Sequence, residues 1–99
     1  MESPEGQPVN VRITRRAERD LANLLRKDPA NFRKVWEDLR KYAAGRLPQT
    51  PKALKGFKPL LWQIESGDFR IFHVWEESIL WIRGVLRKSD QAKRIKGLR

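Results

Sequence analysis

The side chains able to do chemistry in this 99-residue sequence are mainly cationic. Lys and Arg number 22, Asp and Glu number 12, and the formal net charge at pH 7 is +10. An excess of this size in so short a chain attracts polyanions and acidic proteins over long distances. The same excess also keeps a small protein soluble, but its size favours a nucleic acid or an acidic protein as the partner.

Metal and thiol chemistry find little support in the composition. The sequence has no Cys and a single His, His73, so it can form neither disulfide bonds nor thiolate metal sites. One imidazole cannot build a metal site alone. We therefore expect no metal and no small-molecule cofactor. The ordinary pKa of histidine lies near neutrality, which makes His73 a candidate general base.

The first residues and the apolar runs argue against export and membrane insertion. Residues 1–8 are acidic and contain Pro and Gly, so we expect a disordered tail that cannot act as a secretory signal. The apolar run at residues 79–82 is far too short to span a bilayer. No expected helix combines a basic face with a broad apolar one. We predict a cytoplasmic protein without membrane contact.

The elements that must position the cations begin with a strand and a helix. Residues 9–13 alternate apolar and polar side chains, as in a strand with one buried face. Thr14 then offers an N-cap hydroxyl. Over residues 15–27 the apolar positions recur at spacings of three and four, which predicts an amphipathic helix with a charged outer face.

A second helix is predicted directly after the first. Asp28 and Pro29 end the first helix and start the next, because Asp caps free N–H groups and Pro suits a first helical turn. Gly45 ends the second helix, since glycine tolerates left-handed C-cap geometry. Trp36 lies on its apolar stripe, so we expect Trp36 to be buried.

The second half of the chain is predicted to be mainly β-structure. Residues 46–58 contain two Pro and one Gly, which argue for an irregular connector. Strands are then expected at residues 60–65, 69–75 and 79–86, with turns between them. Residues 87–99 are rich in Lys and Arg and are expected to form a short helix or a flexible basic arm.

These elements predict one α+β domain at residues 9–92. In the order β-α-α-β-β-β, the first strand joins a late meander to form a small, mostly antiparallel, four-stranded sheet. Two N-terminal helices pack on one face of this sheet. The other face is then left to solvent or to a partner. Residues 93–99 follow as a basic tail.

Four stretches carry a resemblance when they are taken together and in order. They are the first strand leading into Arg15-Arg16-Ala17-Glu18-Arg19-Asp20-Leu21, then Ala53-Leu54-Lys55-Gly56, then Leu61-Trp62-Gln63-Ile64-Glu65-Ser66-Gly67-Asp68-Phe69-Arg70-Ile71-Phe72, and a last strand that ends at Arg87. In this order they resemble the RelE/ParE superfamily of toxins from bacterial toxin-antitoxin systems. The resemblance spans residues 9–88.

The resemblance implies a compact toxin that a cognate antitoxin neutralises. In the RelE branch it implies a ribosome-dependent endoribonuclease that cuts mRNA in the ribosomal A site, with the RNA 2′-hydroxyl attacking its own phosphate. The expected partners are then the antitoxin, the ribosome and mRNA. A ParE-like toxin that binds DNA gyrase without catalysis is the chief alternative, and a catalytically degenerate basic binding module on the same fold is another.

Two arginines are the catalytic candidates that the resemblance implies. Arg70 matches the hairpin arginine and Arg87 matches the basic residue that closes the last strand, so both are expected to clamp the scissile phosphate through forked hydrogen bonds. Gln63 and Glu65 stand where RelE-like enzymes place Lys or Arg, which favours the ParE-like alternative. Arg70 also has a structural interpretation, as a cross-strand ion-pair partner of Glu65.

Further cations are predicted to contribute to RNA binding, either through phosphate contacts or as solvated charges that attract RNA generally. They are Lys55, Lys58, Lys88, Lys93 and Arg94.

The remaining chemical candidates have competing structural interpretations. If Arg70 faces away from the helices, strand alternation turns His73 towards them, which favours a buried, hydrogen-bonded histidine over a catalytic one. Trp62, Trp75 and Trp81 could stack on unpaired bases, but core packing is the favoured interpretation for most of them.

Overall fold

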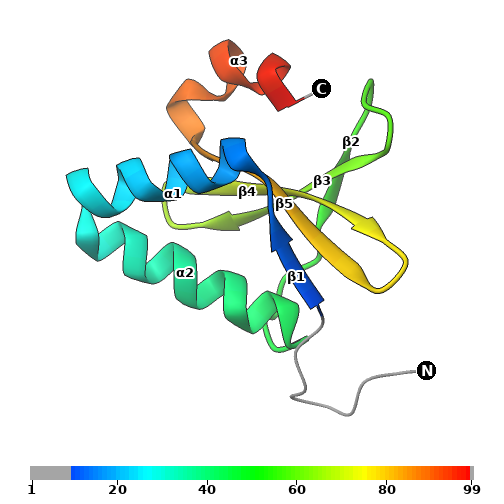
Figure 1. Ribbon diagram of the computed structural model, residues 1–99, viewed down its shortest axis with the longest axis horizontal. Coiled ribbons are helices and arrows are strands. Elements are labelled where there is room, and N and C mark those ends of the chain that lie inside the picture. Colours follow the sequence, from blue (N-terminus) through cyan, green and yellow to red (C-terminus); the bar gives the residue numbers. More distant parts are fainter. Residues whose placement is uncertain (1–9, 99) are drawn as a thin grey trace.

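The computed structural model describes residues 10–98 (Figure 1). The expected tail at residues 1–8 lies outside the described residues, as do Val9 and Arg99. The elements are β1 (Asn10–Ile13), α1 (Arg15–Lys27), α2 (Pro29–Ala43), β2 (Lys52–Leu54), β3 (Leu61–Ser66), β4 (Phe69–Glu76), β5 (Ile79–Arg87) and α3 (Gln91–Arg94), with 3₁₀ turns at Lys88–Asp90 and Ile95–Leu98.

The fold is built around one mixed sheet, in which the strands lie in the order β1-β5-β4-β3-β2. β1 runs parallel to β5, and the other neighbours are antiparallel. The predicted α+β class and the mostly antiparallel sheet are confirmed, but the sheet has five strands instead of four. The additional strand is β2, in the region expected to be an irregular connector. Three residues between Pro51 and the turn at Gly56 are free of proline restrictions and pair with β3.

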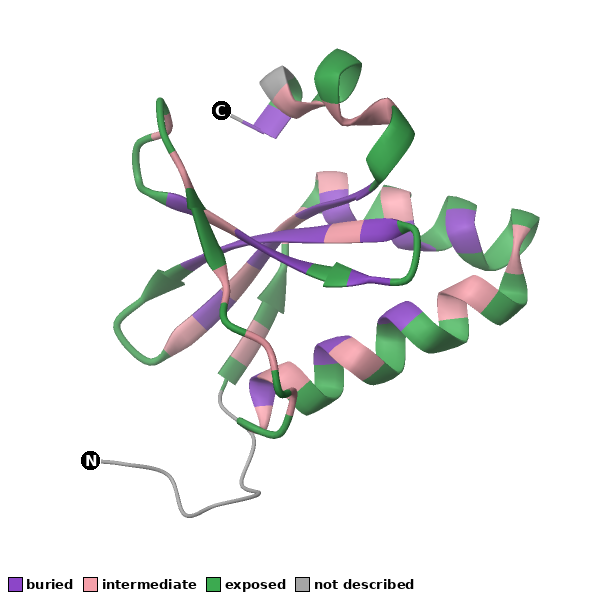
Figure 2. Cartoon of the chain, turned by 180° about the vertical axis from the view of Figure 1, so that it is seen from behind, coloured by how far each residue is buried: buried purple, intermediate pink, exposed green. Residues whose placement is uncertain are grey.

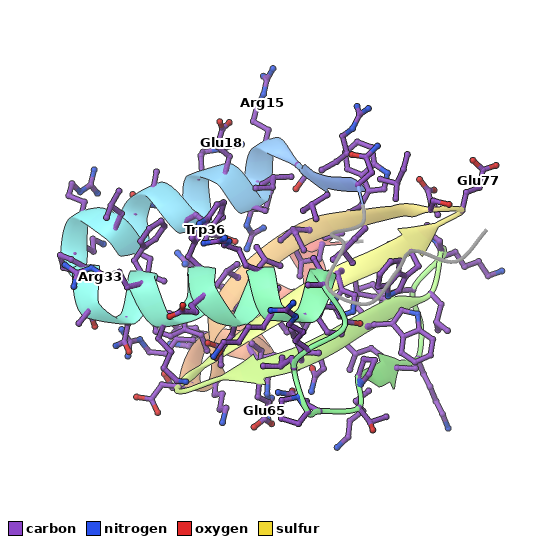
Figure 3. All side chains as sticks on the ribbon, turned by 90° about the horizontal axis from the view of Figure 1, so that it is seen from below. Arg15, Glu18, Arg33, Trp36, Glu65 and Glu77 are labelled. Atoms are coloured by element: carbon purple, nitrogen blue, oxygen red, sulfur yellow. The ribbon has the colours of Figure 1, made fainter. Side chains whose placement is uncertain are left out.

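The two long helices begin and end where the sequence predicts. The Thr14 hydroxyl accepts a hydrogen bond from the N–H of Ala17 at 3.2 Å. Asp28 serves both helices, because its backbone N–H donates to Leu24 and its carboxylate accepts from the N–H of Asn31. Figure 3 shows α1 and α2 together on one side of the sheet, which we call the helix face.

The helix face holds the larger hydrophobic core. Its buried residues come from both helices and from the three central strands, and they include Ala17, Leu21, Val35, Leu39, Ile64, Phe69, Ile71, Leu80, Ile82 and Val85. Trp36, expected to be buried here, is 38% exposed. The inner stripe of α2 runs through Val35, Leu39 and Ala43, and Trp36 lies one residue around the helix from it. Burying these apolar side chains is the main source of stability for the fold.

The opposite side of the sheet, which we call the second face, is covered where the sequence analysis expected it to be open. Ile95 and Leu98 pack there against Leu61, Phe72 and Leu86. They belong to residues 88–98, the cap segment, which folds back over the sheet at one end of the molecule (Figures 1 and 2). Part of the predicted basic arm is therefore a short helix and a buried anchor.

A bulge in β5 decides which side chains reach each face. Phe72 pairs with Gly84, but the next residue of β4, His73, pairs with Ile82, so Arg83 is an extra residue in β5. Such an insertion reverses the alternation of the side chains that follow it. Ile82 and Val85 therefore both lie on the helix face, and Arg87 follows Val85 onto that face.

Candidate nucleic-acid interface

Three charged residues converge on the second face. Arg70 of β4 lies opposite Glu65 of β3, and its Nη2 is 3.6 Å from the Oε2 of Glu65. The Nζ of Lys88, at the start of the cap segment, is 3.0 Å from the Oε1 of Glu65. We call these three residues the Arg70–Lys88 cluster. Figure 3 shows Glu65 on the side of the sheet away from α1 and α2.

The electrostatics of the cluster favour an anion between its cations. The hydrogen bond and the charge of Lys88 lower the pKa of Glu65, with a smaller contribution from Arg70. The carboxylate is therefore ionised at neutral pH, and each of its two oxygens faces one cation. A phosphate presents oxygens at similar spacing, and forked arginine and point-charge lysine contacts are the usual way proteins hold it.

The guanidinium of Arg70 is only partly hydrogen-bonded. Its Nη1 donates to the Oε1 of Gln91 in the cap segment. Its Nε is buried and has no hydrogen-bond partner among the described residues, and the same is true of the Oε1 of Gln63. Gln63 itself is buried and lies on the second face beside the cluster. This part of the second face therefore contains both a donor and an acceptor without protein partners in residues 10–98.

Arg87 lies on the other side of the sheet. Its guanidinium stacks on Phe69, 4.7 Å from the ring centroid, and it lines a cavity of about 230 Å³ beside α1. That cavity also contains Asp20, Asp28 and Asp90. The structure does not bring Arg70 and Arg87 together as the expected clamp requires, because the bulge at Arg83 places the two side chains on opposite faces of the sheet. Lys88 is the cation that the fold brings to Arg70.

The other predicted RNA-binding cations are exposed and lie outside the Arg70–Lys88 cluster. Lys55 and Lys58 lie in the loop between β2 and β3, and Lys93 and Arg94 lie on α3. Figure 1 shows that loop and α3 at the same end of the molecule. Their contribution to RNA binding stays a prediction.

His73 is buried on the helix face, as strand alternation predicts. A chain of hydrogen bonds surrounds it. Trp75 Nε1 donates to the hydroxyl of Tyr42, which lies 2.7 Å from His73 Nε2, and His73 Nδ1 lies 3.3 Å from the carbonyl of Ile71. The consistent assignment is a neutral imidazole with its proton on Nδ1. Burial lowers the pKa of His73 to about 4, so the imidazole is neutral at physiological pH.

The other tryptophans divide between the two faces. Trp81 packs with the second-face cluster around Leu61 and Phe72. Trp75, at the end of β4, is 39% exposed, whereas core packing was the favoured interpretation for most of the tryptophans. It extends past the last turn of α2 and contacts Tyr42 there.

Two residues that matter at the site were not assigned from the sequence. Gln91 reaches Arg70, and Leu98 anchors the segment that carries Gln91. The signal for Leu98 is its spacing of three from Ile95 inside an otherwise charged stretch, which gives one helical turn two apolar side chains on one side. Gln91 has no such signal.

Within residues 10–98, no group of three or more His, Cys, Asp or Glu side chains is placed to hold a metal ion. No helix in the same range has the length and apolar character needed to span a membrane.

Comparison with known proteins shows which known fold this chain shares. No protein-family model matches the sequence, and no curated protein does. Among solved structures, a chain of the toxin-antitoxin complex RelBE2 from Mycobacterium tuberculosis is similar, with a TM-score of 0.67 and 22% sequence identity. The match covers 82% of this chain and 99% of that chain. The α+β arrangement of two N-terminal helices on a mixed, mostly antiparallel sheet is therefore a RelE-like fold.

Proposed function

We propose that this protein is a RelE-like toxin that binds RNA phosphate at the Arg70–Lys88 cluster and cleaves mRNA on the ribosome, which inhibits translation in the cytoplasm. The observation that carries the proposal is that Arg70 and Lys88, from different parts of the chain, meet at the two oxygens of one carboxylate. The fold likeness to a chain of a toxin-antitoxin complex supports the same class of function.

The proposed chemistry needs mainly cations. When the RNA 2′-oxygen attacks its own phosphate, the 2′-hydroxyl gives its proton to water, the bond to the 5′-oxygen breaks, and a 2′,3′-cyclic phosphate forms. The departing 5′-oxygen takes up a proton from water. The intermediate phosphorane carries additional negative charge on its oxygens. In the proposal Arg70 binds two of these oxygens and Lys88 binds one of them, after Glu65 has moved aside. Preorganised charges of this kind contribute most when they meet charge that develops in the transition state.

An antitoxin is the protein partner that this proposal implies. Between α2 and β1 lies a groove of about 560 Å³. Its walls include the exposed side chains of Trp36 and Ile13, and Arg40, Lys41 and Arg46 also line it. An apolar segment with acidic residues at its edges is complementary to this groove. We propose that the cognate antitoxin supplies such a segment.

The proposed activity is tested with purified protein, ribosomes and a defined mRNA. The unchanged protein is expected to cut the mRNA, and Arg70→Ala and Lys88→Ala are each expected to lower the rate about 10²-fold or more. Arg87→Ala is the matched control, because it removes the same charge from the opposite face. Intact mRNA with the unchanged protein removes the enzyme proposal, and equal losses for Arg87→Ala and Arg70→Ala remove the assignment of the site.

A ParE-like inhibitor of DNA gyrase is the second candidate function. It is favoured by Gln63 and Glu65, a neutral amide and an acid where RelE-like enzymes carry cations. A supercoiling assay separates the two candidates. Inhibition of gyrase together with intact mRNA in the ribosome assay would select the ParE-like function.

A further inference from the structure

The cap segment occupies the binding groups of Arg70. One terminal nitrogen, Nη1, donates to Gln91 of the cap segment, and the other, Nη2, faces Glu65. The third nitrogen, Nε, is buried without a partner among residues 10–98. A forked contact with phosphate needs two neighbouring guanidinium nitrogens on one edge. Neither edge of Arg70 has both of its nitrogens free and accessible in this conformation.

The cap segment is held by few contacts. Leu98 is 3% exposed and packs so closely on Gly84 that a Cβ added there would lie 2.6 Å from the Cδ2 of Leu98. Arg83 Nη2 donates to the carbonyl of Leu98 at 3.2 Å. In contrast, Ala92, Lys93 and Arg94 are exposed, and α3 has four residues. A helix this short has little stability of its own, so the anchor at Leu98 holds the segment in place.

The closed position also leaves polar groups unsatisfied. Arg70 Nε and Gln63 Oε1 are both buried without hydrogen-bond partners among the described residues. Burying a polar atom without a partner is unfavourable, and it is more unfavourable for a charged group. Gln91 of the cap segment contacts Arg70, so movement of the segment would return Arg70 Nε to water or to a ligand. The hydrogen bonding of the site therefore favours opening, while the apolar anchor favours closure.

We propose that residues 91–98 of the cap segment are an autoinhibitory element, closed over Arg70 in the free protein and displaced when RNA phosphate binds, while Lys88 stays in place through its backbone hydrogen bond to Asp68. The inference rests on the proposed RNA-binding function of the Arg70–Lys88 cluster. RNA selects the open state, in which Gln91 no longer occupies Nη1 of Arg70, and the phosphate takes the place of Glu65 at Nη2. The apparent affinity for RNA is then reduced by the fraction of molecules that are open.

The test weakens the anchor without changing the charge. Leu98→Ser removes the buried side chain, and Ala92→Ser is the matched control at an exposed position of the same segment. The probe is a short fluorescent single-stranded RNA, with affinity measured by anisotropy at fixed salt. If about a tenth of the protein is normally open, Leu98→Ser is expected to bind up to about tenfold tighter, with no change for Ala92→Ser. The gain should disappear when Leu98→Ser is combined with Arg70→Ala.

A second readout reports the cap without RNA. Phenylglyoxal modifies accessible guanidiniums, and mass spectrometry follows the rate at Arg70. Faster labelling of Arg70 in Leu98→Ser supports the cap. Gln91→Ala keeps the anchor and frees Nη1, so it provides the same comparison if Leu98→Ser does not fold.

The outcomes separate the two proposals. Faster Arg70 labelling without RNA binding by any variant supports the cap and overturns the RNA-binding function. Equal labelling of Arg70 in the unchanged protein, in Leu98→Ser and in Gln91→Ala would show that the cap segment does not cover Arg70. This outcome overturns the autoinhibition proposal, whatever the RNA result. Faster labelling with weaker RNA binding also overturns autoinhibition, because the segment would then be holding Arg70 in its binding position.

Discussion

The two faces of the sheet differ in how completely they are closed. On the helix face, Ile71, Leu80 and Ile82 have no exposed surface, and both ring nitrogens of His73 have partners. On the second face, Arg70 and Gln63 each hold a buried polar atom without a partner among the described residues. Unsatisfied groups of this kind concentrate at functional sites. The comparison assigns stability mainly to the helix face and supports our proposal that RNA binds on the second face.

The difference has its origin in the lengths of the covering elements. α1 and α2 have 13 and 15 residues and bring a repeated apolar stripe to the sheet. The cap segment brings Ile95 and Leu98. Buried apolar area therefore holds the helices firmly, whereas the cap segment opens at a smaller cost in free energy.

The largest expected effect comes from the centre of the helix face. Ile71→Ala is expected to lower the free energy of unfolding by about 3–5 kcal/mol, because it leaves a cavity in a core that cannot collapse around it. Leu98→Ala also removes a buried side chain, but we expect a smaller loss of unfolding free energy. The loss cannot exceed the free energy needed to open the cap segment, because the segment can open while the rest of the protein stays folded. Urea denaturation of both variants measures the two losses of unfolding free energy. Equal losses would contradict the division between the faces.

The next effect is a pH dependence from the helix face. The pKa of His73 is about 4 in the folded protein, below its ordinary value of 6.5, so the unfolded chain binds more protons between these values. The stabilisation by neutral His73 is complete above pH 6.5 and is lost as the pH falls towards 4. The difference in pKa corresponds to at most about 3 kcal/mol.

Denaturation between pH 4 and pH 7 isolates this contribution when it is repeated with His73→Gln, which keeps polar atoms at the position but does not titrate. The variant should lose stability at pH 7 and show a shallower decline below pH 6.5. Parallel curves for the two proteins would show that the environment of His73 does not couple folding to protonation.

A smaller effect is expected at the helix caps. Asp28→Ala removes the carboxylate that caps α2 and should lower the free energy of unfolding by about 1 kcal/mol. Asp90, before α3 in the cap segment, makes no side-chain capping bond, so Asp90→Ala should change stability by less than about 0.5 kcal/mol. Thermal unfolding of both variants provides the measurement. A larger loss for Asp90→Ala would mean that the cap segment is more firmly folded than its contacts indicate.

The sequence predicts the features that are set by local chemistry. Thr14, Asp28 and Pro29 define the helix ends through their own hydrogen bonds and backbone limits, and the alternation of β4 places His73 on the helix face. The bulge at Arg83 is different, because it depends on how β5 pairs with β4, and no local sequence pattern predicts it. That single residue moves Arg87 away from Arg70.

A short helix after β5 was one of the predicted alternatives, but its packing on the second face was not predicted, for a related reason. Its charge suggested a solvated arm, while its position depends on the space beside Gly84, which only the folded sheet creates. The partnership of Lys88 with Glu65 likewise follows from the turn after β5, where the backbone N–H of Lys88 donates to the carbonyl of Asp68. Candidate residues could be selected from the sequence, but their grouping required the three-dimensional fold.

The smallest expected effect on stability, and the most direct test of the second face, is Glu65→Gln. The side chain of Glu65 is half exposed, so its ion pairs with Arg70 and Lys88 are screened by water and their loss should leave thermal unfolding almost unchanged. Binding of single-stranded RNA should become several-fold tighter, because an anion that competes with phosphate for both cations is removed. Glu76→Gln, at the opposite end of β4, raises the net charge equally and controls for general attraction. A gain of the same size in both variants would show that RNA responds to overall charge and not to the Arg70–Lys88 cluster.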